Sequence, residues 1–202
     1  MKKLRHPVVL AILLLVLYVL FEFVFSSSIE AISSYAPYVV ELLWVGLVFY
    51  TLKKVEWKKG SGMVKPLAIC AGIFAGGIAA DLGAHKMGMI IPFNYESKEV
   101  VLFLLIIGPI LEELIFRGGL WRIFETLRFN YVGTVFICAI AFACSHLYLY
   151  NAVPESYQPF IAYQGAYTLI LGIFCGVLRG NNGLRFAMLA HLLFNFGFWL
   201  VR

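Results

Sequence analysis

The chain has little charge for its length. Only 13% of its 202 residues are charged, whereas 62% are hydrophobic and the mean hydropathy is +0.89. A soluble domain is about half apolar and about a quarter charged. The shortage of charge therefore excludes an ordinary soluble domain. It predicts an all-α, polytopic membrane protein built as a bundle of transmembrane helices.

The chain also lacks the patterns of a metal-binding or disulfide-stabilised scaffold. Its four cysteines lie in apolar segments and without the spacing of metal ligands: Cys70, Cys138, Cys144 and Cys175. The zinc-helix signature His-Glu-x-x-His is absent. The net charge is +5, but the basic residues are scattered over short loops, so we predict no nucleic-acid partner.

Hydrophobic runs of about 20 residues predict about seven membrane spans. They cover residues 7–25, 38–52, 64–80, 100–120, 131–150, 160–178 and 184–201. The third span is rich in glycine, and residues 81–95 after it suit a re-entrant or interfacial segment. No repeat or linker marks a second globular unit, so we expect a single helical bundle.

The basic residues predict the orientation of these spans. Of the 16 lysines and arginines, all but Lys86, Lys98 and Arg202 fall on one side of the expected topology. An excess of basic residues at every second loop marks the cytoplasmic side. We therefore expect the N-terminus in the cytoplasm and, with an odd number of spans, the C-terminus outside.

Three charged residues interrupt the apolar run of the fourth span. Charge is costly inside a bilayer, so Glu112, Glu113 and Arg117 indicate function more than a structural ion cluster, which is the alternative. On a helix Glu113 and Arg117 share a face, whereas Glu112 lies about 100° away. We predict that Glu113 pairs with Arg117 and that Glu112 faces a polar cavity as a general base. Gly108-Pro109 just before them frees a backbone carbonyl.

Two later spans carry histidines with polar or aromatic residues one helical turn away. His191 and Asn195 project from one face and could donate hydrogen bonds to a tetrahedral intermediate. The alternative is polar contact between helices. His146, which follows Phe142 by one turn, suits helix packing as well as catalysis. Polar clusters in three separate spans favour one shared cavity.

The three motifs together resemble a known family. They are Glu112-Glu113-x-x-x-Arg117, Phe142-x-x-x-His146 and His191-x-x-x-Asn195. This ordered set resembles the CAAX-protease and bacteriocin-processing (CPBP, or Abi) intramembrane endopeptidases. The resemblance implies a catalytic helical core over residues 100–202, preceded by spans in residues 1–99 that carry no recognised motif. It also implies hydrolysis of a peptide bond by a glutamate-activated water.

The resemblance assigns a role to each motif residue. Glu112 would activate the water, with His146 assisting, while His191 and Asn195 would stabilise the oxyanion. Three further residues would support the site: Glu113, Arg117 and Phe142. Family members have also been described as metalloproteases, and two histidines with glutamates could bind zinc. Because the zinc-helix signature is absent, we predict a site without metal or other cofactor.

The expected partners are the lipid bilayer and a membrane-bound or lipophilic peptide, because such a substrate can reach a buried site laterally. The short chain is typical of a prokaryotic enzyme of the cell membrane. Two other functions remain open, namely a self-immunity or scaffold protein without catalysis and a proton-coupled transporter. A transporter is disfavoured, because the chain lacks the pair of interrupted hydrophobic segments that is typical of one. A thiol protease built on Cys144 and His146 is disfavoured, because residues two apart on a helix face different ways.

Overall fold

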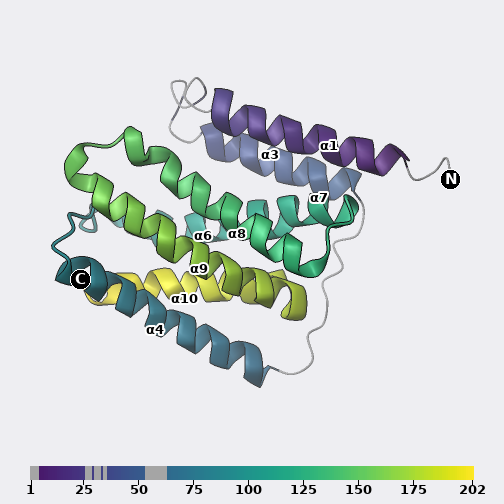
Figure 1. Ribbon diagram of the computed structural model, residues 1–202. Coiled ribbons are helices and arrows are strands. Elements are labelled where there is room, and N and C mark those ends of the chain that lie inside the picture. The colour runs from purple at the N-terminus through teal and green to yellow at the C-terminus, as the bar shows by residue number, and fades with distance from the viewer. Residues whose placement is uncertain (1–4, 26–28, 30–32, 34–35, 53–62) are drawn as a thin grey trace.

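The structure is a computed structural model that describes residues 5–25, 29, 33, 36–52 and 63–202 (Figure 1). Within these residues all regular structure is helical, which confirms the predicted all-α class. The main helices are α1 (Arg5–Leu20, continued by the π-helical η2, Phe21–Phe25), α3 (Ala36–Thr51), α4 (Val64–Lys86), α8 (Tyr131–Leu147), α9 (Gln158–Asn182) and α10 (Leu184–Leu200). Two short 3-10 turns, η5 (Tyr148–Asn151) and η6 (Glu155–Tyr157), connect α8 to α9.

The segment between α4 and α8 alternates between α-helical and π-helical turns. It comprises α5 (Lys98–Leu102), η3 (Phe103–Ile107), α6 (Gly108–Glu113), η4 (Leu114–Leu120) and α7 (Trp121–Thr126). The Gly108 N–H bonds to the carbonyl of Phe103, five residues back. In that register the next donor would be the nitrogen of Pro109, which has no hydrogen, so the Leu104 carbonyl is left free.

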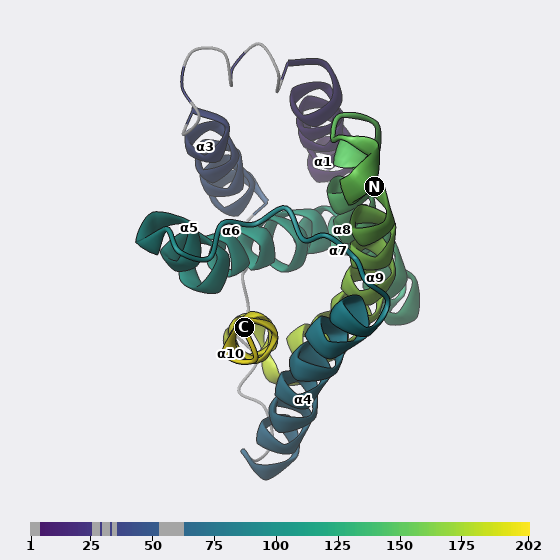
Figure 2. The ribbon, with the colours of Figure 1, turned by 90° about the vertical axis from the view of Figure 1, so that its left-hand side faces the viewer.

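Helices α1 and α3 lie together on the side of the molecule away from α4 (Figures 1 and 2). The Trp44 indole N–H donates to the Leu14 carbonyl across 3.0 Å. Helix α3 packs on η4 at two glycines. A Cβ on Gly118 would lie 2.8 Å from the Phe49 ring, and one on Gly119 would lie 2.5 Å from the Trp44 ring. Larger residues at these positions would push α3 off the segment that bears the charged motif.

Glycines also bring α4 and α10 into backbone contact. A Cβ on Gly77 would lie 2.1 Å from the carbonyl oxygen of Phe194, and one on Gly197 would lie 2.3 Å from that of Phe74. Helices α8 and α9 also approach each other at a glycine, since a Cβ on Gly172 would lie 3.0 Å from the Cα of Ala139. Helices α8, α9 and α10 thus lie around the segment from α5 to α7, which carries the charged motif.

Three helical segments among the described residues are long and apolar enough to cross a bilayer: Val64–Lys86, Tyr131–Asn151 and Glu155–Asn182. Three shorter apolar helices accompany them: His6–Leu20, Ala36–Thr51 and Leu184–Leu200. Large apolar side chains such as Leu43 and Ile170 are exposed on the outside, as expected where lipid is the solvent. The protein is an integral, multi-pass membrane protein.

The boundaries differ most from the predicted spans in two places. The third helix continues beyond residue 80 to Lys86, and the rest of the stretch predicted as a re-entrant or interfacial segment belongs to an irregular loop over residues 87–97. The fourth predicted span is the composite segment from α5 to α7. Six lysines used to predict the orientation lie outside the described residues: Lys2, Lys3, Lys53, Lys54, Lys58 and Lys59.

Candidate active site

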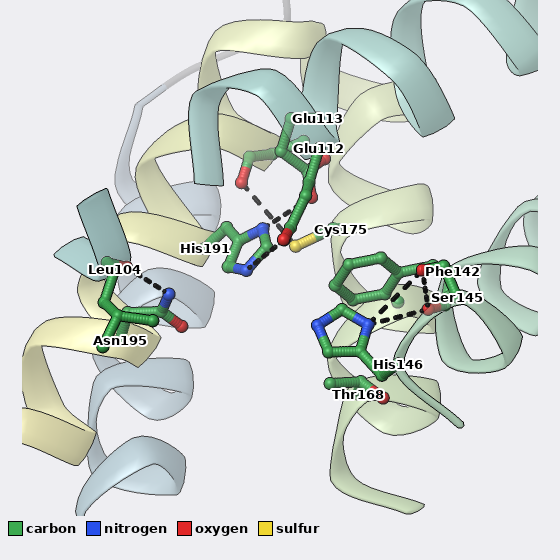
Figure 3. Close-up of polar contacts among 12 residues, drawn as sticks. Leu104, Glu112, Glu113, Phe142, Ser145, His146, Thr168, Cys175, His191 and Asn195 are labelled. Atoms are coloured by element: carbon green, nitrogen blue, oxygen red, sulfur yellow. Dashed lines mark hydrogen bonds and ion pairs between the residues drawn. The ribbon is translucent and has the colours of Figure 1, made fainter. Parts of the chain in front are cut away.

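One cavity of about 80 Å³ lies among η3, α6, α8, α9 and α10, with the 87–97 loop along one side. Its lining includes all four residues predicted to be catalytic: Glu112, His146, His191 and Asn195. The volume admits a few water molecules, since one needs roughly 10–15 Å³. Figure 3 shows His191 and His146 on either side of this space, with Glu112 beside His191.

The two adjacent glutamates have different environments. Glu113 is fully buried, and its Oε1 accepts from Arg117 Nη1 at 2.9 Å, so the predicted pair is present. Glu112 lines the cavity and its side chain is 32% exposed. The helical offset between neighbouring residues produces this separation. One carboxylate is held within the protein and the other is open to a small molecule.

Arg117 is also fully buried and links several helices. Its Nη2 donates to the Gly172 carbonyl on α9 at 3.0 Å. Its own backbone carbonyl accepts from Arg179 Nε at 2.9 Å. Within the described residues Arg117 Nε has no acceptor. A buried guanidinium with incomplete hydrogen bonding depends heavily on the Glu113 carboxylate.

His191 lies between the two glutamates. Its Nδ1 is 3.0 Å from Glu113 Oε1, and its Nε2 is 3.5 Å from Glu112 Oε2. The ring is 2% exposed, so it is fixed by the protein rather than by solvent. Through His191 the buried ion pair is connected to the carboxylate that lines the cavity. The sequence paired His191 only with Asn195 and did not reveal this bridge.

His146 presents one ring nitrogen to the cavity. Its Nδ1 lies 2.9 Å from the backbone carbonyl of Phe142, which can only accept, so Nδ1 carries the hydrogen. The Ser145 hydroxyl donates to the same carbonyl at 2.8 Å. Nε2 is therefore the unprotonated nitrogen of the neutral ring. It is available as an acceptor on the cavity side.

Phe142 supports the site with its ring. It is fully buried, and the Arg117 guanidinium lies 4.6 Å from its ring centroid. Edge contacts join it to His146 at 4.8 Å and to His191 at 5.4 Å. The aromatic ring thus fills the space between the cation and both imidazoles. A cation facing a desolvated ring gains about 2 kcal/mol or more.

Asn195 is held by the backbone carbonyl that Pro109 leaves free. Its Nδ2 donates to the Leu104 oxygen at 2.7 Å. Because that oxygen requires a donor, the orientation of the amide is fixed, and the second N–H of Nδ2 remains for another acceptor. The break in the helix before Glu112 therefore positions a residue of the last helix.

The cavity also contains residues that the sequence analysis missed. Gln164 and Thr168 line it from α9, four residues apart on one helical face. The same spacing rule that singled out His191 and Asn195 could have found them. Phe93 and Tyr95 line it from the 87–97 loop, and no sequence pattern indicated them.

An ion pair between a buried aspartate and the partly exposed Arg202 holds this loop in place. Asp81 is fully buried, and its carboxylate accepts from Arg202 Nη2 at 2.5 Å. The Arg202 guanidinium lies 4.4 Å from the Tyr95 ring centroid and 5.1 Å from that of Phe198. Both aromatic residues line the cavity, so this pair fixes one of its walls.

The donor set does not fit a catalytic zinc ion. In the part of the chain that the structure describes, no group of three His, Cys, Asp or Glu side chains is arranged as metal ligands. The ring nitrogens of His191 face Glu113 and Glu112, and Nδ1 of His146 is bonded to a carbonyl. The remaining groups are His146 Nε2 and Glu112, whereas catalytic zinc sites use three protein ligands.

Comparison with known families gives one match. Residues 96–197 match the family described as Type II CAAX prenyl endopeptidase Rce1-like. Searches of curated proteins and of solved structures found no match. The matched residues include all three motifs and the further cavity residues Gln164 and Thr168.

Proposed function

The chain belongs to the Rce1-like family of type II CAAX prenyl endopeptidases, which are proteases, and from this premise we propose that it cleaves a peptide bond within the membrane by means of a water molecule activated by Glu112. The observation that carries the proposal is the single cavity lined by Glu112, His146, His191 and Asn195. A carboxylate, an imidazole acceptor and amide donors are the groups that water attack on a carbonyl requires.

Glu112 is the base in this mechanism. Glu113 is committed to Arg117 and His191, so Glu112 is the motif carboxylate that can approach a water molecule. The unprotonated Nε2 of His146 would accept the second hydrogen of that water and fix its orientation. Glu112 then takes one proton as the water oxygen attacks the carbonyl carbon, and the C=O π electrons move onto the oxygen.

Donors on α10 would receive the resulting negative charge. The second N–H of Asn195 is available for the oxyanion. His191 lies one helical turn away on the same face, and because its Nδ1 hydrogen points to Glu113, it would donate from Nε2 with both ring nitrogens protonated. Collapse of the tetrahedral intermediate breaks the C–N bond, and the proton held by Glu112 passes to the leaving nitrogen. The Glu112 carboxylate is regenerated, and the two products are an amine and a carboxylic acid, which releases the second hydrogen of the water to solvent as it ionises.

Glu113, Arg117 and Phe142 would act as positioning residues. Glu113 fixes the His191 ring through Nδ1, and Phe142 packs against both imidazoles. Holding reacting groups in one geometry is itself a large part of catalysis. The burial of all three residues supports this role, since none needs to touch the substrate.

The substrate we propose is a membrane-bound or lipophilic peptide or protein. The cavity lies among helices of a multi-pass membrane protein, so a substrate within the bilayer has the shortest path to it. The proposal includes seven bilayer crossings with a cytoplasmic N-terminus, a catalytic core over residues 100–202 following N-terminal spans, and a place in a prokaryotic cell membrane. The distribution of basic residues and the position of the motifs support it.

The test compares two glutamate substitutions in liposomes that contain a tagged lipophilic peptide. Glu112→Gln removes the proton acceptor with little change in shape, and we expect cleavage to disappear. Glu99→Gln changes an exposed glutamate on α5 and should leave cleavage at the parent rate. Normal cleavage by Glu112→Gln would refute the mechanism. A parent protein that cleaves no peptide would favour the scaffold or immunity alternative.

A further inference from the structure

A second, larger space adjoins the catalytic cavity. It is a groove of about 610 Å³ between α4 and α9. Gly72, Gly76 and Ala79 line its α4 wall, and Ala166 and Ile170 line its α9 wall. Tyrosines are the only polar side chains among its lining residues, and the Tyr163 hydroxyl donates a hydrogen bond to the Ala80 carbonyl. The groove therefore suits apolar groups and offers little to a charged or polar ligand.

The two faces of α4 differ in how they are occupied. Gly77 is in backbone contact with α10, whereas a Cβ on Gly72 or Gly76 would meet nothing within 4 Å. The lack of side chains on the second face keeps the groove wide. Glycine here does not serve close packing within the described chain, because no neighbour occupies the space.

The groove shares a wall with the catalytic cavity. Tyr167, Leu171 and Phe194 line both spaces. The rings of Tyr167 and Phe194 are in contact, with centroids 5.5 Å apart. A substrate group in the groove therefore lies one layer of side chains from the cavity that contains Glu112.

We propose that the α4–α9 groove is a specificity subsite that receives the apolar side chains next to the scissile bond of an extended peptide. This inference rests on the proposed protease function. An extended chain advances about 3.3 Å per residue, so the residues within three of the cut lie within about 10 Å of it. A space that shares a wall with the catalytic cavity lies in the region that their side chains can reach.

The size of the groove sets the preference. Leucine and phenylalanine side chains bury much apolar surface there, whereas alanine buries little. Selection for large apolar residues would follow from the open faces of Gly72 and Gly76.

The test fills the groove and measures which peptides are still cut. Gly76→Leu places a side chain into the groove, and its Cβ meets nothing within 4 Å. Gly46→Leu is the matched control, because a Cβ there also meets nothing within 4 Å and Gly46 lies on α3, outside the groove. Both variants gain the same helix propensity. The probes are two pools of synthetic lipophilic peptides in liposomes, one with alanine and one with leucine or phenylalanine at each varied position.

We expect Gly76→Leu to lower kcat/KM for the leucine and phenylalanine pool by about 10-fold or more and for the alanine pool by less than about twofold. Gly46→Leu should match the parent on both pools. Ala166→Leu fills the same groove from α9 and provides the same test if Gly76→Leu does not fold. An unchanged ratio between the two pools would refute the subsite, as would an equal loss on both pools in folded protein.

Other occupants give different outcomes. If Gly76→Leu displaces a copurified phospholipid, measured by mass spectrometry, while the ratio between the pools is unchanged, the groove holds lipid and the subsite is refuted. Failure of the protease proposal is distinguishable, because then the parent cuts neither pool. When the parent cuts and Glu112→Gln does not, the groove variants test the subsite alone.

Discussion

Glu112 and Glu113 are neighbours in the chain, and the difference between them depends on burial. Glu113 has no exposed surface and shares one oxygen between Arg117 and His191, whereas Glu112 is one-third exposed to the cavity. A change at either residue should therefore have a different effect. Substitution of Glu112 should abolish peptide cleavage, whereas substitution of Glu113 or Arg117 should lower the stability of the fold.

Arg117→Ala tests the structural side of this division. The substitution leaves the Glu113 carboxylate buried with one fewer partner, and breaking a buried pair typically costs about 3–5 kcal/mol. We expect a clearly lower melting temperature in detergent. Lys98→Ala, at an exposed residue of α5, should melt like the parent. A variant Arg117→Ala as stable as the parent would show that the pair contributes nothing to the fold.

Asn195→Ala tests the oxyanion side. The substitution removes the donor proposed for the developing charge, so turnover should fall by about 10²–10³ while KM changes little. It also leaves the Leu104 carbonyl without its donor, which costs about 1–3 kcal/mol of stability. Steady-state kinetics on one tagged peptide separates kcat from KM. Full turnover by Asn195→Ala would exclude the amide from the oxyanion site.

At the scale of helices, α4 and α10 are in backbone contact, a property that no sequence pattern indicated. Gly197→Ala would place a Cβ 2.3 Å from the Phe74 carbonyl oxygen, and backbone cannot move aside as a side chain can. Overpacking of this kind costs about 1–3 kcal/mol or more. Gly46→Ala, which meets nothing, should equal or exceed the stability of the parent. Similar melting of the two variants would show that the helices are further apart.

The sequence predicted features that depend on one helix at a time. Spacing alone gave the Glu113–Arg117 pair, and the cost of charge in a bilayer singled out the segment that contains it. The π-helical turns at η3 and η4 left no trace in hydropathy, because shifting the hydrogen-bond register changes no residue. Pro109 indicated a free carbonyl, but nothing near it in sequence identified Asn195 as the donor.

Contacts between distant segments account for the rest of the site. His191 reaches Glu113 across 78 positions of the chain, and the 87–97 loop joins the cavity wall through Arg202. Such contacts depend on how helices cross, which a single sequence does not specify. The resemblance to an intramembrane protease family identified the motif residues that line the cavity. It did not identify the hydrogen-bond partners of the side-chain nitrogens of His146, His191 and Asn195.

For the whole molecule, the composition of the site predicts independence from metal. Two free donor groups, His146 Nε2 and Glu112, are too few to hold a catalytic zinc ion. We therefore expect the purified protein to keep its cleavage rate after dialysis against excess EDTA. Loss of cleavage that added zinc restores would mean that a metal generates the nucleophile, and the mechanism would have to be replaced.

Gly77 and Gly197, at the contact between α4 and α10, determine how the site residues of the last helix are oriented. Gly197 follows Asn195 by two residues and His191 by six, and its fit against the backbone of α4 allows one rotation and one height for the last helix. An insertion of a single residue between His191 and Gly197 would turn the imidazole by about 100° and shift it by about 1.5 Å relative to that contact. The absence of side chains at Gly77 and Gly197 thus sets the direction in which His191 and Asn195 point.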